Sequence, residues 1–331
     1  MNNRIPYIDA AKGLSIIAVV LSHEFSSVKP LVLFLNSFML PAFFFLSGVC
    51  TNVDKYTFRN FTTHRFKSLI IPYLGLGAIV SALSLIWSDA DNVIGNISQS
   101  LFSWQTLWFL PVLFLASVIA FAINKLCKSD NKRMFTASIL FLSIGSILDY
   151  KHIIMAMSLS TTFVAVFYIV LGCVLRKYVL DSKYMLRKSL PFVFALFLLV
   201  ISTYDSTLNL NGNAINPVYK KVLGSMIGIA WLLLVCKLIL DYGNKTSLNY
   251  MLVFIKHGGG IMKYVGTNTL TVLAFHMPIF FVLQHYLKPI MGNTIFYKLV
   301  EMIIIWAVVV WLNIILNRYC PLLLGKLNRK Q

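Results

Sequence analysis

Apolar residues form long runs along this chain, and short polar connections separate them. A run of about 20 apolar residues is long enough to cross the hydrocarbon core of a bilayer as one α-helix. The pattern predicts ten such spans, at residues 6–25, 31–50, 68–88, 102–124, 134–149, 153–175, 190–204, 218–240, 267–287 and 297–318. The connection at 241–266 contains His257 and three glycines and is predicted to be a loop. We therefore expect an all-α, polytopic transmembrane helix bundle that forms a single domain over residues 1–331.

The distribution of charge supports this class and predicts its orientation. Hydrophobic residues make up 58% of the 331 residues and charged residues only 12%, about half the charged share of a soluble domain. Of the 29 Lys and Arg residues, 22 fall on the connections that include both termini and 6 on the alternate ones, with Lys12 inside the first span. By the positive-inside rule both termini are predicted to be cytoplasmic. The net charge of +18 is then a topology signal, and we expect no nucleic-acid partner.

Cysteine positions fit the same topology. All five cysteines fall at predicted cytoplasmic ends of spans, where thiols stay reduced. No set of His, Cys, Asp and Glu has metal-ligand spacing, so we expect no bound metal. The first span carries Lys12 and lacks an A-x-A cleavage site, which predicts that it is retained as a membrane anchor.

Two ionisable residues inside the first span are the strongest candidates for chemistry. Lys12 and His23 are separated by three helical turns plus about 20°, so they share one face and lie about 16 Å apart. Charged or ionisable groups are costly inside a membrane, which favours a functional role. The alternatives are that Lys12 reaches the inner interface with Asp9 as its i,i+3 partner, and that His23 bonds to a neighbouring helix.

Five sequence blocks follow one another along the chain: YIDAAKG with LSH in the first span, FMLPAFFFLSG in the second, RFKSLIIPY at 65–73, LWFLPVLF at 107–114 and GTNTLTVLAFHMPIF at 266–280. The series resembles the integral-membrane acyltransferase family 3, whose members O-acylate cell-envelope sugars, and the resemblance spans nearly the whole chain. It implies acyl-CoA, most often acetyl-CoA, as a cytoplasmic co-substrate and no permanently bound cofactor. It also implies an acceptor hydroxyl on an envelope polysaccharide or lipid-linked sugar, at the outer side of the bacterial cytoplasmic (inner) membrane.

The resemblance also implies roles for individual residues. The residues expected at the cytoplasmic donor end are Asp9, Lys12, Ser47, Arg65 and Lys67. Their cations suit the phosphates of coenzyme A. His23 is expected to be the general base that accepts the proton of the acceptor hydroxyl. A covalent acyl-imidazole intermediate is the less favoured variant.

For several other polar and aromatic residues, the sequence allows both a functional and a structural role. His276, in the ninth span, either orients the acceptor or polarises the thioester, or it is a core histidine with its hydrogen bonds satisfied. Trp108 either stacks on a sugar or belongs to the aromatic belt or the core. The glycines after His257 are a flexible loop, or their N–H groups contact coenzyme A phosphate. Glu301 is expected near the outer interface, whereas a deep position favours a proton-coupled transporter.

The leading functional hypothesis is a membrane O-acetyltransferase that modifies envelope glycans. The alternative is a polytopic transporter or flippase of lipid-linked sugars that uses the polar face of the first span as its pathway. A third hypothesis is a non-catalytic membrane scaffold. The ordered blocks favour the transferase, because a transporter has no reason to share them.

Overall fold

The computed structural model describes residues 5–84, 107–153, 155, 158–181, 189–203, 217–243 and 250–326. Within these ranges the chain is helical and contains no strand, which confirms the all-α prediction. Six helices are long and apolar enough to cross a membrane: Lys29–Cys50, Phe58–Ala82, Phe109–Leu126, Val218–Asp241, Thr269–Tyr286 and Ile295–Tyr319. The protein is thus a multi-pass, membrane-embedded helical protein. Ten spans and two cytoplasmic termini stay predictions.

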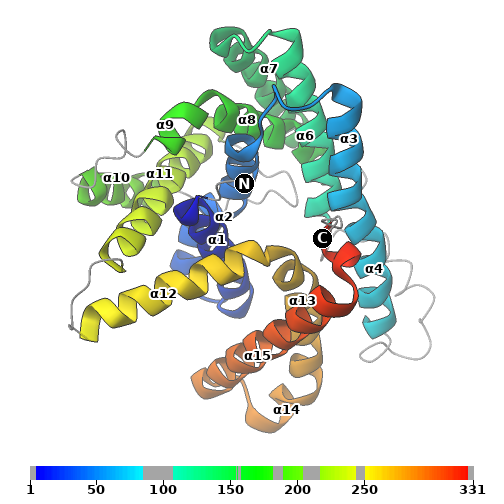
Figure 1. Ribbon diagram of the computed structural model, residues 1–331. Helices are drawn as coiled ribbons and strands as arrows, with labels where there is room; N and C mark the ends of the chain where they lie inside the picture. Colours follow the sequence, from blue (N-terminus) through cyan, green and yellow to red (C-terminus); the bar gives the residue numbers. More distant parts are fainter. Residues whose placement is uncertain are drawn as a thin grey trace. The chain divides into compact units, whose positions relative to one another are not determined.

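Each predicted span overlaps a helix of the structure (Figure 1). These helices are α1 (Pro6–Glu24), α2 (Lys29–Cys50), α4 (Ile71–Ser84), α6 (Phe109–Leu126), α7 (Asn131–Tyr150), α8 (Ser160–Val174), α10 (Leu190–Ser202), α11 (Val218–Gly243), α13 (Thr269–Tyr286) and α15 (Ile295–Tyr319). Of the predicted spans, residues 85–88, 102–106, 154, 156–157 and 204 lie outside the described residues.

The chain divides into two compact units. The first comprises residues 1–55, 119–155 and 159–269, and it includes the short helix α9 (Arg176–Leu180) and the helix α12 (Tyr250–Thr267). The second comprises residues 56–118, 156–158 and 270–331, and it includes α3 (Phe58–Arg65) and α14 (Lys288–Met291). Each unit is described by itself below.

Helix α12 corrects the prediction of a loop at 241–266. Residues 250–267 are helical, and α12 passes across α1 in the first unit, where the two helices pack extensively (Figure 1). Three consecutive glycines each cost an isolated helix about 1 kcal/mol relative to alanine. Burial of Gly259, Val265 and Gly266 within the first unit compensates that cost. Tertiary contact therefore overrides the weak local preference.

A pair of glycines brings the backbones of α1 and α12 into direct contact. A Cβ on Gly13 of α1 would overlap the carbonyl oxygen of Met262, and a Cβ on Gly266 of α12 would overlap that of Asp9. Small residues are the usual means by which membrane helices approach so closely. At this distance Cα–H groups of one helix contact carbonyls of the other.

A second glycine pair joins α2 to α8 in the same way. A Cβ on Gly48 would overlap the carbonyl oxygen of Ile169, and a Cβ on Gly172 would overlap that of Phe45. The missing side chain of Gly48 thus permits the close approach of the two helices. Two reciprocal glycine crossings thus hold the first unit together.

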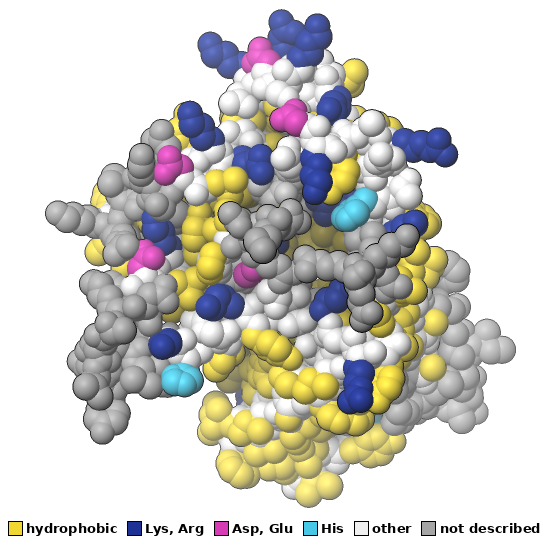
Figure 2. All heavy atoms as spheres, viewed as in Figure 1, with side chains coloured by type: hydrophobic (Ala, Val, Ile, Leu, Met, Phe, Trp, Pro, Cys, Tyr) yellow, Lys and Arg dark blue, Asp and Glu magenta, His cyan; other side chains and the backbone are white. Residues whose placement is uncertain are grey.

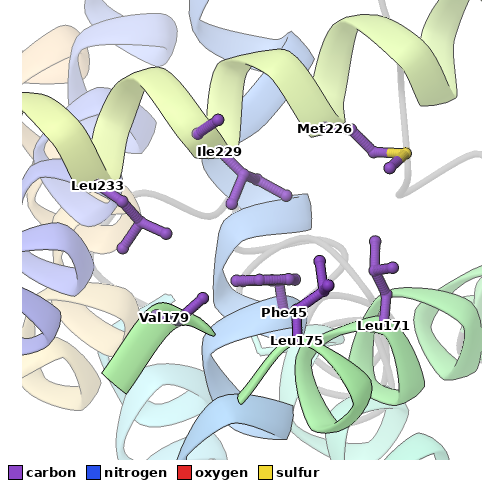
Figure 3. Close-up of a pocket in the computed structure, with 8 residues that line it drawn as sticks. Phe45, Leu171, Leu175, Val179, Met226, Ile229 and Leu233 are labelled. Carbon is purple, nitrogen blue, oxygen red and sulfur yellow. The ribbon is translucent and has the colours of Figure 1, made fainter. Parts of the chain in front are cut away.

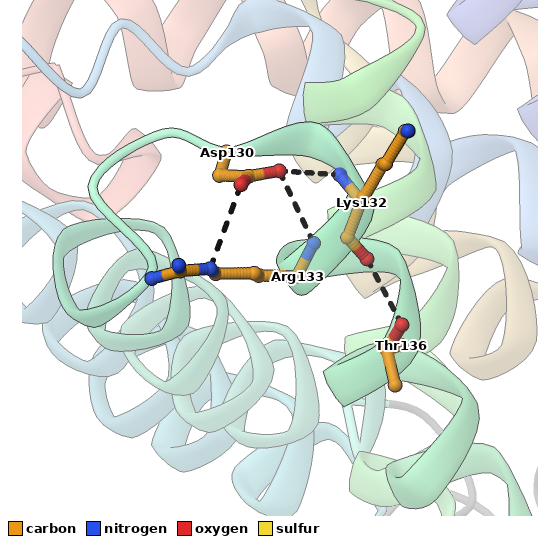
Figure 4. A network of polar contacts seen from close by, with 4 residues as sticks. All are labelled: Asp130, Lys132, Arg133 and Thr136. Carbon is orange, nitrogen blue, oxygen red and sulfur yellow. Dashed lines mark hydrogen bonds and ion pairs between the residues drawn. The ribbon is translucent and has the colours of Figure 1, made fainter.

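Helix α7 begins at a side-chain cap (Figure 4). The Oδ1 atom of Asp130 accepts hydrogen bonds from the backbone N–H groups of Lys132 at 2.9 Å and Arg133 at 3.3 Å. Its Oδ2 atom lies 3.5 Å from Nε of Arg133. A capping aspartate satisfies N–H groups that have no partner inside the helix. The cap explains why α7 starts at Asn131, before the predicted 134.

In the second unit, the helix that contains the RFKSLIIPY block begins at Phe58. This is ten residues before the predicted start of the span at 68. Helix α3 continues through a π-helical turn, Phe66–Ile70, into α4. Pro72 has no N–H to donate to the Ser68 carbonyl, and a wider turn accommodates that missing bond. Gly325, at φ +64°, approaches the same carbonyl, where a Cβ would come within 2.5 Å of its oxygen.

The surface of the second unit is strongly apolar. Helix α15 exposes large side chains, with Ile303 at 69% and Trp311 at 61% exposure. Figure 2 shows apolar side chains gathered over the region of α13 to α15. An apolar surface of this kind on a membrane protein is suited to contact with lipid tails.

The glycine crossing of α1 and α12 yields a matched test. We expect Gly266→Ala to lower the thermal midpoint of the detergent-solubilised protein, because overpacking costs about 1–3 kcal/mol. We expect Gly260→Ala on the same helix to leave the midpoint unchanged or raise it, because nothing lies within 4 Å of a Cβ there and alanine favours helix by about 1 kcal/mol. The measurement is the monodisperse fraction after heating, by size-exclusion chromatography. Equal thermal midpoints for Gly266→Ala and Gly260→Ala would contradict the close contact of α1 and α12 at Gly266.

Candidate functional site

Helix α1 carries three of the predicted site residues. It begins at Pro6, a favoured first residue of a helix. Lys12 is partly exposed and His23 is exposed, at the two ends of one face. Between them Ile16 and Val19 are only 1% and 5% exposed. The two ionisable groups therefore lie at the ends of a face whose middle is buried.

The ammonium group of Lys12 is directed to the carboxyl end of α2. Its Nζ atom lies 3.6 Å from Sγ of Cys50. A thiol sulfur is a weak acceptor. Asp9, three residues before Lys12, forms no ion pair with it among the described residues. The alternative in which Asp9 neutralises Lys12 is therefore not found.

Further donors meet the same end of α2. Nε of Arg176 donates to the carbonyl of Val49 at 3.0 Å, and Sγ of Cys173 donates to that of Gly48 at 3.5 Å. The hydroxyl of Thr51 donates to the carbonyl of Ser47 at 2.8 Å. The last carbonyls of a helix have no partner inside it, and these donors satisfy them.

Arg176 is the residue near this end that sequence analysis did not single out. It had been counted only among the basic residues that predict topology. The available signal was its place directly after α8, at the start of the short helix α9. The hydroxyl of Tyr7 on α1 donates to the carbonyl of Val179 on α9. Contacts therefore connect α1 to α2, α2 to α9, and α9 back to α1.

An apolar pocket lies beside this group of contacts, between α2, α8, α9 and α11 (Figure 3). Its volume is about 150 Å³. A cavity of that size in an apolar core holds a molecule as large as benzene. Phe45, Leu171, Val179, Ile229 and Leu233 are among its lining residues, and all the residues that line it are apolar. The pocket therefore supplies no group for acid–base chemistry.

His276 belongs to the second unit and is 3% exposed. Its Nδ1 atom lies 2.8 Å from the carbonyl oxygen of Val272 and 3.1 Å from that of Leu273. A carbonyl only accepts hydrogen bonds, so Nδ1 carries a proton, and in a neutral ring the lone pair is then on Nε2. This tautomer fits both interpretations of His276, as a core residue and as a proton acceptor.

The remaining predicted residues also lie in the second unit. Trp108 is 8% exposed and packs edge-to-face against Phe109, with ring centroids 6.1 Å apart. The guanidinium of Arg65 lies over the ring of Phe61, 5.2 Å from its centroid, and Lys67 is exposed. Residues two apart on a helix point about 200° apart. The structure therefore does not bring Arg65 and Lys67 to one side of their helix.

A polar network crosses the interior of the second unit. The hydroxyl of Thr271 on α13 donates to Oδ1 of Asn313 on α15 at 3.0 Å, and Nδ2 of Asn317 donates to the same atom at 2.8 Å. Lys326 donates to Asn317. Glu301, on the same buried side of α15, is fully buried within the protein.

The described ranges hold no cluster of metal ligands. No three His, Cys, Asp or Glu side chains in that part of the chain lie together as metal ligands. The five cysteines are all free thiols.

Comparison with known proteins gives a match to a protein family. A family model described as an acyltransferase domain, that of acyltransferase family 3, matches residues 5–318. No curated protein and no solved structure matches the chain.

The polar network of the second unit is testable by its hydrogen bonds. We expect Thr271→Val to lower the free energy of unfolding by about 1 kcal/mol, because Asn313 loses a buried donor. Thr269→Val is the control, since the Thr269 side chain forms no hydrogen bond with the described residues. Thermal midpoints in detergent provide the measurement. A double variant with Asn313→Leu should show non-additive losses; strict additivity would argue against the bond.

Proposed function

The chain belongs to acyltransferase family 3 and is a membrane acyltransferase, and from this premise we propose that it is an O-acetyltransferase of envelope glycans. Acetyl-CoA would be the cytoplasmic donor. The acceptor would be a hydroxyl of an envelope polysaccharide or lipid-linked sugar at the outer side of the bacterial inner membrane. The family match over residues 5–318 carries the proposal, because it includes all five sequence blocks of the resemblance.

The proposed donor site is the cytoplasmic end of α1 and α2. Lys12 supports it, since its ammonium group contacts only a weak acceptor and no carboxylate within the described residues. Such a cation is suited to bind coenzyme A phosphate. Asp9 and Ser47 flank Lys12 in this proposal. Arg65 and Lys67, in the second unit, are proposed as further donor contacts.

In the proposed transfer step His23 acts as general base. The acceptor oxygen attacks the thioester carbonyl carbon while the imidazole of His23 takes the hydroxyl proton. The tetrahedral intermediate then collapses, its carbon–sulfur bond breaks, and the imidazolium returns the proton to the departing thiolate. The products are the acetyl ester and coenzyme A. His276 is proposed to orient the hydroxyl or polarise the thioester, and Trp108 to flank the sugar ring.

The route between the two ends sets a requirement on this mechanism. The pantetheine arm of the donor has to extend about 16 Å along α1 to bring the thioester from Lys12 to His23. Because Ile16 and Val19 on that face are buried, the proposal requires the helices packed over them to part when the donor binds. Movements of this kind are common in enzymes that enclose their substrates.

Mass spectrometry of envelope glycans from cells with and without the gene tests the function directly. The expected result is one acetyl increment on a glycan that depends on the gene. Membranes that contain the protein should also consume labelled acetyl-CoA. A transporter or flippase would move the glycan without consuming the donor, so an unchanged donor pool would favour that alternative.

Replacement of His23 tests the general base. We expect His23→Ala to reduce acetyl transfer at least 100-fold, because proton transfer by a positioned side chain contributes about 10²–10⁴-fold. The amount of folded protein should not change, since the His23 side chain is exposed. His285→Ala, which removes another exposed histidine, is the control. Activity in the His23 variant within tenfold of wild type would remove His23 from the mechanism.

Replacement of Lys12 tests the donor site. We expect Lys12→Ala to raise KM for acetyl-CoA about tenfold with little change in kcat, because a charge-assisted contact to phosphate is lost. Lys12→Arg should retain donor affinity. Lys29→Ala, at the opposite end of α2, is the control. An unchanged KM in Lys12→Ala would exclude the donor role.

A further inference from the structure

Two cations from different helices converge on the carboxyl end of α2. Nζ of Lys12 lies 3.6 Å from Sγ of Cys50, and Nε of Arg176 lies 3.0 Å from the carbonyl oxygen of Val49. Val49 and Cys50 are neighbours, and few covalent bonds separate the two contacted atoms. Standard bond lengths therefore place the two nitrogens no more than about 13 Å apart.

Neither Lys12 nor Arg176 forms an ion pair with a carboxylate in the part of the chain that the structure describes. The acceptors that they meet are a thiol and a peptide carbonyl, which are uncharged. The carboxyl end of a helix carries about half a negative charge, less than the two full positive charges beside it. Both side chains are only partly exposed. A partly buried site with excess positive charge favours a bound anion.

The two cations are also held in place before any ligand binds. The hydrogen bond from Tyr7 to Val179 connects α9 to α1, and the crossing of Gly48 with Gly172 connects α8 to α2. A site whose residues are positioned by supporting contacts loses less conformational entropy on binding.

We propose that Arg176, together with Lys12, binds the phosphate groups of the acyl-CoA donor. Nε of Arg176 is engaged by Val49, and among the described residues the two terminal NH₂ groups have no partner, so they can form a bidentate contact with one phosphate. Coenzyme A carries a diphosphate and a separate ribose 3′-phosphate, two anionic groups for two cations. This inference rests on the proposed acyl-CoA donor and adds to it a residue from a helix outside the recognised blocks.

The test compares Arg176→Gln with Lys177→Gln, which removes the adjacent exposed cation. With purified protein in nanodiscs, we expect Arg176→Gln to weaken coenzyme A binding and raise KM for acetyl-CoA, each by about tenfold or more, with kcat retained. Binding to the wild type should weaken with added salt more steeply than binding to Arg176→Gln. We expect Lys177→Gln to stay within threefold of wild type. An Arg176→Gln variant with unchanged coenzyme A affinity overturns the proposal.

A purely structural role of Arg176 predicts a different pattern. It would lower the yield of folded protein and kcat without changing the salt dependence of donor binding. We expect Arg176→Lys to recover part of the affinity, since the charge is kept while the bidentate geometry is lost.

A measurement on the wild-type protein covers the case in which Arg176→Gln does not fold. Phenylglyoxal modifies guanidinium groups, and mass spectrometry locates the modified residues. We expect coenzyme A to protect Arg176 and to leave Arg318, an exposed arginine of α15, unprotected. Equal modification of Arg176 with and without coenzyme A overturns the proposal.

The results distinguish a failure of the proposed phosphate site from a failure of the proposed function. If the wild type acetylates a glycan while Arg176→Gln keeps its KM, the phosphate site is wrong and the function stands. If coenzyme A binds and protects Arg176 but no acetyl transfer occurs, the site stands and the transferase function is wrong.

Discussion

The first unit depends on two places where helix backbones touch without intervening side chains. Gly13 and Gly266 join α1 to α12, and Gly48 and Gly172 join α2 to α8. Without a hydrophobic driving force between helices in lipid, close van der Waals contact of this kind is the main source of helix association. Each crossing also lies beside a charged residue, because Gly13 follows Lys12 and Gly48 precedes Val49, the partner of Arg176. The crossings therefore determine where the charged groups of the donor end lie.

That arrangement has a chemical consequence. Cations near the carboxyl end of a helix can donate to its last carbonyls, and the Val49 carbonyl of α2 serves Arg176 in this way. Carbonyls stabilise a cation without neutralising it, whereas a carboxylate would do both. The absence of ion pairs with Lys12 and Arg176 in the described ranges leaves both charges available for the anionic donor that we propose. The proposed donor site follows from this distinction.

Sequence analysis predicted the helices from long apolar runs and the shared face of Lys12 and His23 from helical periodicity, and the five blocks led to the family that the whole-chain match shows. It was wrong about α12, because three glycines lower helix preference and packing against α1 and α11 offsets that cost. It placed the start of the third span too late, because the polar residues of α3 interrupt the apolar run although the helix continues through a π turn. It passed over Arg176, whose contact with Val49 joins residues 127 positions apart.

The sequence by itself determined the class of the protein, since long apolar runs, low charge and an uneven distribution of Lys and Arg are local and additive properties. It also determined that Lys12 and His23 share a face, because helical periodicity needs no partner. Only the tertiary structure decided that Lys12 meets Cys50 rather than Asp9, that Arg176 reaches the same helix end, and that Ile16 and Val19 are buried between the two ends. Those outcomes depend on which distant segments pack together, and the spacing of residues along one helix carries no information about its neighbours.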